Sequence, residues 1–231
     1  MTTDLMIRTY HGDFNWLEFC LQSTIRHASG FRNVVLVMDD ADAAMVGPSY
    51  REKYKIVSTG TTWKDGYIQQ MNDKLHGDLH SDADYIVHTD SDCVWTRDIT
   101  PESLMEGGKP VWLMHPFGGD ENPWPPIVLA ALGFNSEYSF MRRHPFMVPR
   151  NIYKGYRDFM ENRHQMPLRD YIISQPYRQF IEYESLGCWA FKHAHDAFVW
   201  KDQADFPTFV RQEWSWGGLT EEIQKELQQH C

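Results

Sequence analysis

Short apolar runs alternate with segments of helical periodicity over the first hundred residues. The runs predict strands over 5–9, 33–38, 54–58 and 85–89. Apolar residues three or four apart predict a helix over 14–25 and another over 66–79 that begins near Asp65. The run 33–38 is almost uniformly apolar, which is typical of a strand buried on both faces of a parallel sheet. This order predicts an α/β fold with a doubly wound, mostly parallel sheet that binds its ligand at the carboxyl ends of the strands.

The pattern is less regular after residue 100. It predicts strands over 111–114 and 140–148, a loop over 115–126, and helices over 151–162 and from about Thr220. Because no repeat or linker divides the chain, we expect one domain over 1–231. Within it, residues 1–100 should form a sheet of the nucleotide-binding type, and residues 101–231 should shape a pocket.

Composition narrows the class of protein. The 231 residues are 42% apolar and 14% aromatic, which excludes a disordered chain. The formal net charge of −10 disfavours nucleic acid and anionic membranes as partners, although a local basic groove is compatible with it. No stretch approaches the roughly 20 apolar residues that span a bilayer, so we expect a cytoplasmic protein without stable membrane insertion. The four cysteines form no Cys-x-x-Cys pair and are expected to be reduced thiols.

Asp-x-Asp sequences occur at several places, and their context distinguishes them. Asp82 and Asp84 precede a predicted strand, where a solvated turn is expected. Asp90 and Asp92 follow the strand 85–89 and therefore lie at the ligand end of the sheet. Two carboxylates at this spacing can present oxygens to one hard cation and leave its other positions for water and phosphates, which is how Mg²⁺ is usually held. An Asx turn at the strand end is the alternative.

Five short motifs follow one another in the order of a known class of enzyme. They are Thr9-Tyr10-His11-Gly12-Asp13, Asp39, the helix Gly66 to Leu75, Asp90-Ser91-Asp92, and Glu182-Tyr183-Glu184-Ser185-Leu186-Gly187. Together they resemble the GT-A class of glycosyltransferases, and more narrowly a bacterial and viral family with a Gly-aromatic-x-x-Gln helix ending in Lys-Leu, then Asp-x-Asp and Glu-Tyr-Glu. The resemblance implies a Rossmann-like GT-A fold and an enzyme that moves a sugar from a nucleotide sugar to an acceptor hydroxyl.

The same resemblance implies a donor, with a UDP-sugar as the first choice, and a Mn²⁺ or Mg²⁺ ion. Asp90 and Asp92 would bridge the metal to the donor diphosphate, with Asp92 the direct ligand and Asp90 also close to the donor ribose. A bound cation stabilises the negative charge that develops on a leaving diphosphate. Many proteins of this class supply a third ligand from the C-terminal half, for which His195 is the candidate, with His193 and His115 beside it. An ordinary surface or core imidazole is the other interpretation.

Contacts to the donor are implied at the ends of the first two strands and on the helix 66–75. The nucleoside would lie against Thr9, Tyr10 and Asp13. The Tyr10 ring would cover the base, or else serve as ordinary packing. Asp39 would hydrogen-bond the base or ribose, although a helix N-cap fits it equally well. The sugar or phosphates would be reached by Gln70 and Lys74, which share a helix face; a solvated face is the alternative for Lys74.

The candidates for the catalytic group are acidic residues in the second half of the chain. An inverting transfer needs a carboxylate that takes the proton from the acceptor hydroxyl. Glu182 and Glu184 are the candidates, and only one of them can face a pocket, whether the segment is a strand or a helix. Glu182 is preferred because it aligns with the Glu-Tyr element, although Ile181 stands where the family often has Ser. If the reaction retains configuration, the leaving phosphate deprotonates the acceptor and neither acid is required.

The sequence is compatible with more than one acceptor and with more than one function. A saccharide is the default acceptor, and a hydroxymethylated DNA base is the viral alternative. A phosphate-binding strip for such a base would be formed by Arg142, Arg143, His144, Arg150, Lys154 and Arg157. A helix face of solvated charge explains the last three equally well. An acceptor sugar or base would stack on Trp124, Trp189, Trp214 or Trp216, unless these rings are core and rim residues. The rivals are a haloacid-dehalogenase-type phosphatase with Asp90 as nucleophile, a nucleotidyltransferase and a non-catalytic nucleotide-sugar binder.

Overall fold

The computed structural model describes residues 1–60, 66–117 and 123–231. Its helices are α1 (Phe14–His27), α2 (Asp40–Met45), α3 (Pro48–Lys53), α4 (Gly66–Leu75), α5 (Gly77–His80), α6 (Trp124–Leu132), α7 (Arg150–His164), α8 (Leu168–Ser174), α9 (Glu182–His193) and α10 (Glu221–Leu227). Its strands are β1 (Thr3–Arg8), β2 (Val34–Met38), β3 (Lys55–Ser58), β4 (Tyr85–Asp90), β5 (Cys93–Trp95), β6 (Met105–Glu106), β7 (Lys109–Pro116), β8 (Tyr138–Ser139), β9 (Phe146–Pro149), β10 (Val199–Asp202) and β11 (Val210–Gln212).

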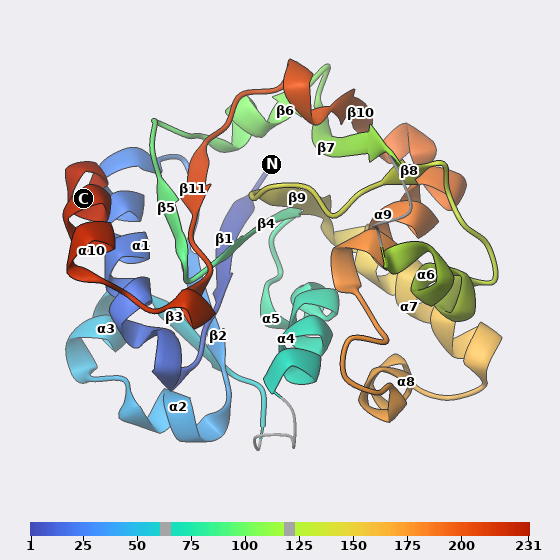
Figure 1. Ribbon diagram of the computed structural model, residues 1–231, viewed down its shortest axis with the longest axis horizontal. Coiled ribbons are helices and arrows are strands. Elements are labelled where there is room, and N and C mark those ends of the chain that lie inside the picture. Colours follow the sequence, from blue (N-terminus) through green and yellow to red (C-terminus); the bar gives the residue numbers. More distant parts are fainter. Residues whose placement is uncertain (61–65, 118–122) are drawn as a thin grey trace.

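The central sheet has the strand order β3-β2-β1-β4-β9. Strands β1 to β4 run parallel, and β9 is antiparallel to β4 at the edge. This confirms the predicted α/β architecture with a mostly parallel central sheet between helices (Figure 1). The register places Arg8 of β1 opposite Asp90 of β4, so both residues lie at the carboxyl edge of the sheet.

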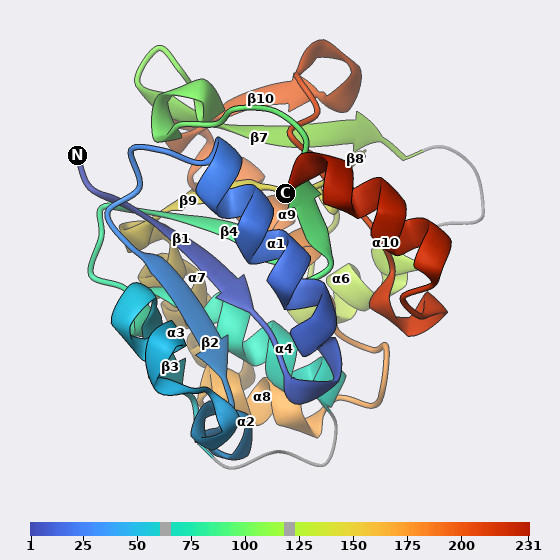
Figure 2. The ribbon, with the colours of Figure 1, turned by 90° about the vertical axis from the view of Figure 1, so that its left-hand side faces the viewer.

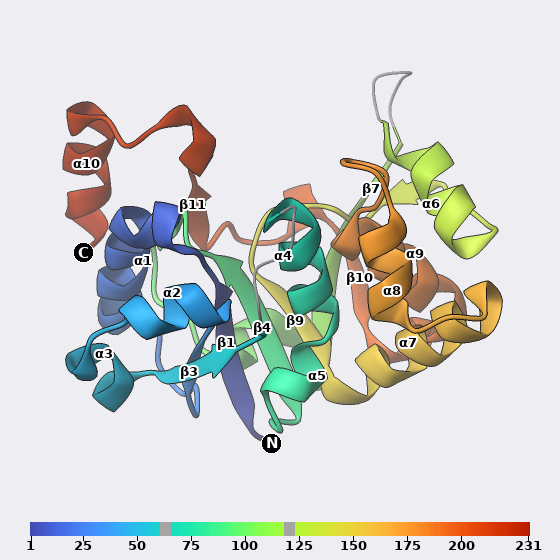
Figure 3. The same ribbon diagram turned by 90° about the horizontal axis from the view of Figure 1, so that it is seen from below.

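Apolar residues on both faces of the strands explain why the sheet is buried from both sides. Successive strand residues point to opposite faces. Leu5 and Ile7 therefore pack in one cluster with Leu17 and Leu21 of α1, and Met6 packs in another that includes α4. Figure 2 shows α1 crossing in front of β1, and Figure 3 shows α1 to α3 on one side of the sheet and α6 to α9 on the other.

Smaller sheets build the second half of the chain. β7 pairs with β10, β6 and β8. β11 pairs with β5, which brings the C-terminal segment beside the loop after β4. None of the helices in the described parts of the chain is long and apolar enough to span a membrane.

Some predicted boundaries are wrong in this second half. The strand predicted over 140–148 is confined to β9, because Arg142, Arg143 and His144 leave the sheet and Pro145 has no N–H for a ladder hydrogen bond. The loop predicted over 115–126 is also too long. β7 continues to Pro116, and α6 begins at Trp124 with prolines in its first turn, where the missing N–H groups have no helical partner to lose. Residues 118–122 of that loop lie outside the described residues.

The helix predicted over 66–79 is divided into α4 and α5 at His76. At Gly77 a Cβ would lie 3.1 Å from the Tyr153 ring and 3.3 Å from the His88 ring, so this turn packs closely against its neighbours. The predicted start near Asp65 lies outside the described residues. The helices over 14–25, over 151–162 and after Thr220 are confirmed, and Thr220 caps α10 by accepting from Ile223 N.

Gly187 lies inside α9, where the helix approaches Phe140 closely. A Cβ at this position would clash with the Phe140 Cβ and would lie 2.7 Å from its Cγ and 3.2 Å from Trp112. The Phe140 Cβ is bonded directly to the backbone, so rotation of the side chain cannot move it away. The glycine of the Glu-Tyr-Glu motif is therefore explained by packing.

We predict that Gly187→Ala lowers the free energy of unfolding by about 1–3 kcal/mol, because overpacking outweighs the better helix propensity of alanine. Urea denaturation measures this change. Gly217→Ala is the control, since a Cβ there meets nothing within 4 Å. A Gly187→Ala protein as stable as the wild type would contradict the packing account.

Candidate functional site

A cavity of about 1100 Å³ opens at the carboxyl end of β4. We call it the main cavity. Its walls come from α4, α6, the segment 141–144, the connection between α8 and α9, and the C-terminal segment. Its lining includes Tyr67, Gln70, Lys74, Asp90, Trp124, Met141, Arg142, Arg143, His144, Gln175, Arg178, Gln179, Glu182, Gln203, Gln212 and Trp214. The carboxyl ends of parallel strands are where ligands bind in such sheets, as the sequence predicts.

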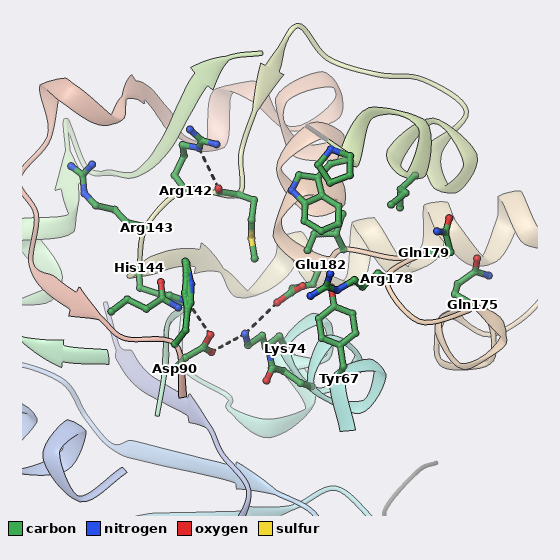
Figure 4. A pocket seen from close by; sticks show the side chains of 18 of the residues that line it. Tyr67, Lys74, Asp90, Arg142, Arg143, His144, Gln175, Arg178, Gln179 and Glu182 are labelled. Atoms are coloured by element: carbon green, nitrogen blue, oxygen red, sulfur yellow. Dashed lines mark hydrogen bonds and ion pairs between the residues drawn. The ribbon is translucent and has the colours of Figure 1, made fainter. Parts of the chain in front are cut away.

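An ion cluster centred on Lys74 lies along one wall of the main cavity (Figure 4). The Lys74 ammonium lies 2.7 Å from Asp90 Oδ1 and 3.2 Å from Glu182 Oε1. The three groups come from α4, β4 and α9, and the Lys74 side chain is only 2% exposed. The cluster therefore joins the sheet to the second half of the chain.

Electrostatic pairing within the cluster keeps Lys74 and Asp90 in their charged forms. Burial alone would lower the pKa of Lys74, but Asp90 and Glu182 raise it above its ordinary value. Burial alone would raise the pKa of Asp90, but Lys74 and His144 hold it well below its usual range. His144 donates from Nε2 to Asp90 Oδ2 over 3.1 Å. Each carboxylate oxygen of Asp90 thus faces a nitrogen donor of the protein.

Asp92 fastens the C-terminal segment to the loop after β4. Its Oδ2 accepts from Ser215 N at 3.1 Å, and its backbone carbonyl accepts from Glu213 N at 2.9 Å. These bonds bring Trp214 to the wall of the main cavity. Burial and the charge of Asp90 raise the pKa of Asp92 to about 6.

Asp13 lies beside the same loop. It accepts from Ser91 Oγ at 3.1 Å, and burial raises its pKa. The structure therefore brings Asp13 to Asp90 and Asp92, whereas the sequence analysis placed it at the nucleoside.

A second cavity, of about 630 Å³, lies at the carboxyl ends of β1 and β2. We call it the side cavity. It is lined by Arg8, Tyr10, His11, Asp39, Ala41, Asp42, Met45, Gly66, Tyr67, Gln69, Gln70, Tyr177 and Trp216. Tyr67 and Gln70 line both cavities, so the two adjoin along α4.

The predicted donor-binding residues divide between these cavities. Tyr10 and Asp39 line the side cavity, Lys74 and Asp90 line the main cavity, and Gln70 lies between them. The Asp39 carboxylate also caps α2 by accepting from Asp42 N at 2.8 Å. Thr9 is buried, and its backbone N–H donates to Val37 O at 3.0 Å.

The two glutamates of the Glu-Tyr-Glu motif face different surroundings in α9. Glu182 lines the main cavity. Glu184 Oε2 accepts from Ser139 Oγ at 3.0 Å, from Phe140 N at 2.9 Å and from Met141 N at 2.7 Å. Glu184 therefore anchors the segment that continues into the wall of the main cavity, and it does not line that cavity.

The arrangement of these acids does not fit the predicted divalent ion. Among residues 1–60, 66–117 and 123–231, no three His, Cys, Asp or Glu side chains are grouped to hold a metal. Asp90 is paired with Lys74 and His144, so a metal bridging Asp90 and Asp92 would have to displace one of them. The His195 side chain is 57% exposed beside Asp196, and His115 pairs with Asp202. We assign no chemical step to a metal, and its presence stays a prediction.

Several residues of the main cavity were not assigned to it from sequence. His144 was assigned to a phosphate-binding strip, because no local signal links it to Asp90, 54 residues away. Arg178 likewise carries no pattern that marks it as a cavity residue, and Tyr67 belongs to the Gly-aromatic-x-x-Gln motif but was given no role from sequence. Trp124 and Trp214 line the main cavity. Trp189 packs in the core against Tyr156.

Comparisons with known proteins give no family for this chain: no protein-family model matches it, and no curated protein matches it.

The raised pKa of Asp92 predicts a dependence of stability on pH. A carboxyl with a pKa near 3.8 when unfolded and about 6 when folded binds more protons in the folded state between these values. Its contribution to stability therefore falls as pH rises through that window and stays low above it. Asp92→Asn removes the unfavourable contribution of the buried carboxylate to stability. The asparagine side chain still has an oxygen that can accept from Ser215 N.

We expect Asp92→Asn to melt at a higher temperature than the wild type at about pH 7.5, with the difference shrinking toward about pH 4. Thermal melts across this pH range measure it. A lower melting temperature for Asp92→Asn at about pH 7.5 would contradict a penalised carboxylate.

Proposed function

We propose that the protein is a glycosyltransferase of the GT-A type, which moves a sugar from a nucleotide sugar to an acceptor hydroxyl. The observation that carries the proposal is the pair of adjoining cavities at the carboxyl edge of a mostly parallel sheet. One is lined by aromatic rings and the other holds a buried acid beside basic groups. A donor with a base at one end and a sugar at the other matches this division.

The side cavity suits a nucleoside. Its aromatic lining consists of Tyr10, Tyr67, Tyr177 and Trp216. Tyr10 is 42% exposed and Trp216 is 87% exposed, so both present ring surface on which a base can stack. Arg8 and Asp39 add polar groups that can orient a ribose or a base edge.

The main cavity suits the sugar and the acceptor. Glu182 Oε1 pairs with Lys74, and Glu182 Oε2 is buried without a hydrogen-bond partner among the described residues. In an inverting transfer, this oxygen takes the proton of the acceptor hydroxyl while the acceptor oxygen attacks the anomeric carbon. The bond from that carbon to the diphosphate breaks, and the electron pair leaves with the diphosphate. Glu184 is already bound by three donors and has no such role.

We favour a saccharide over DNA as the acceptor, because two of the six residues of the predicted phosphate-binding strip pair with acids and the chain carries a formal charge of −10. Lys154 pairs with Asp158, and Arg157 pairs with Asp78, so neither offers a free charge to a phosphate backbone. Trp124 and Trp214 line the main cavity and can pack against the apolar face of a sugar ring.

The test is to incubate the protein with a panel of nucleotide sugars and saccharide acceptors and to measure release of the nucleoside diphosphate. We predict that Glu182→Gln lowers kcat at least about 100-fold and leaves the KM for the donor nearly unchanged, because the base acts in the chemical step. The exposed Glu222→Gln on α10 is the matched control and should retain wild-type activity.

Two outcomes would point elsewhere. Nucleotide binding without consumption of any sugar donor would indicate a binding protein. Release of phosphate from a model ester, abolished in Asp90→Asn, would indicate a phosphatase.

A further inference from the structure

The main cavity concentrates positive charge in an acidic protein. Its basic side chains are Lys74, Arg142, Arg143 and Arg178, and its carboxylates in the described residues are Asp90 and Glu182. Both carboxylates pair with Lys74, and Asp90 also pairs with His144. The acids are thus paired within the cluster, while the whole chain carries a formal charge of −10. The arginines therefore dominate the electrostatic potential that a ligand encounters in the main cavity.

Arg142 and Arg143 are held in place by neutral acceptors. Arg142 donates from Nε to Met141 O at 3.2 Å and from Nη2 to Ser139 Oγ at 3.0 Å. Arg143 donates from Nη2 to the carbonyls of Gln203 at 2.6 Å and Phe206 at 2.5 Å. In the described parts of the chain, neither guanidinium lies within ion-pair distance of a carboxylate. Glu184 and Asp202 interact with these arginines through their charges, but carbonyls and hydroxyls, not carboxylates, supply the hydrogen bonds that orient the guanidinium groups.

Arg143 also has a donor that the protein does not use. Its Nε is buried and has no hydrogen-bond partner among the described residues, and burial lowers its pKa. A buried guanidinium N–H without a partner is unfavourable unless a ligand supplies an acceptor.

Arg178 belongs to the wall opposite the segment 141–144. It lies in the connection between α8 and α9, next to Tyr177, whose ring centre is 5.4 Å from its guanidinium carbon. Figure 4 shows Arg142 and Arg143 on one side of the Asp90–Lys74–Glu182 cluster, with their guanidinium ends directed away from it, and Arg178 on the other side. The main cavity is therefore lined by arginines from two of its walls.

We infer that the main cavity binds the diphosphate of the donor directly through Arg142, Arg143 and Arg178, and that these cations replace a divalent metal in stabilising the leaving group. The inference rests on the proposed function. Guanidinium groups bind phosphate oxygens through paired hydrogen bonds, which suits them to this task. Lys74 and His144 assist by compensating Asp90, so that its carboxylate does not repel the diphosphate.

The test measures binding of UDP and of inorganic pyrophosphate by calorimetry, once in EDTA and once with Mn²⁺. We expect both ligands to bind in EDTA, with dissociation constants that Mn²⁺ changes less than about threefold, and we expect binding to weaken as salt is raised. Arg142→Gln and Arg178→Gln should each weaken binding about tenfold or more. Arg97→Gln is the matched control, because Arg97 is exposed, lines neither the main cavity nor the side cavity, and the variant should bind like the wild type.

The outcomes distinguish failure of the arginine-based diphosphate site from failure of the proposed glycosyltransferase function. If UDP and pyrophosphate bind only with Mn²⁺, or if both arginine variants bind like the wild type, the inference is wrong. Sugar transfer that requires Mn²⁺ would also overturn it and would leave the proposed function intact. Pyrophosphate binding in EDTA without turnover of any nucleotide sugar would support the anion site and contradict the proposed function. Arg178 is exposed, so Arg178→Gln provides a readout even if substitution of Arg142 impairs folding.

Discussion

The buried ammonium of Lys74, held between Asp90 and Glu182, is the interaction on which the rest of the site depends. Taking these charges out of water is costly, and only their mutual pairing compensates for it. Because α4, β4 and α9 each supply one member, the three elements must meet at one point for any of the charges to be compensated. The cluster therefore adds a charged constraint to the apolar packing of Tyr183, Leu186 and Trp189, which also holds α9 against the sheet. Such a cluster favours one arrangement strongly even where its net contribution to stability is small.

Other acids act on the site through the backbone segments that they hold. Glu184 fixes the segment 139–141, which leads directly to Arg142, Arg143 and His144. Asp92 fixes the segment 213–215, which carries Trp214 to the wall of the main cavity. The motifs that the sequence marks as chemical thus contain two kinds of acid. Asp90 and Glu182 face the cavity, while Glu184 and Asp92 hold the chain that surrounds it.

The sheet could be predicted from sequence because its information is local. The almost uniformly apolar run 33–38 indicates a buried strand, and Thr220 before two glutamates indicates the start of a helix. The site could be predicted only in part, because its pairings join distant residues. Asp90, Lys74 and Glu182 were each identified as candidates, but no pattern distinguishes a buried lysine from one on a solvated helix face. The link between His144 and Asp90 depends on where the chain leaves the sheet after β8, and that departure was predicted as a strand.

The central claim is that Lys74 and Glu182 are energetically coupled, because each compensates the buried charge of the other. A double-mutant cycle of Lys74→Met, Glu182→Gln and the double variant tests it most directly, with the free energy of unfolding measured by urea denaturation. The account predicts that each single variant is clearly destabilised and that the double variant loses less than the sum of the two by more than about 1.5 kcal/mol. Losses that add within about 0.5 kcal/mol would mean that the two residues do not interact, and would contradict the account.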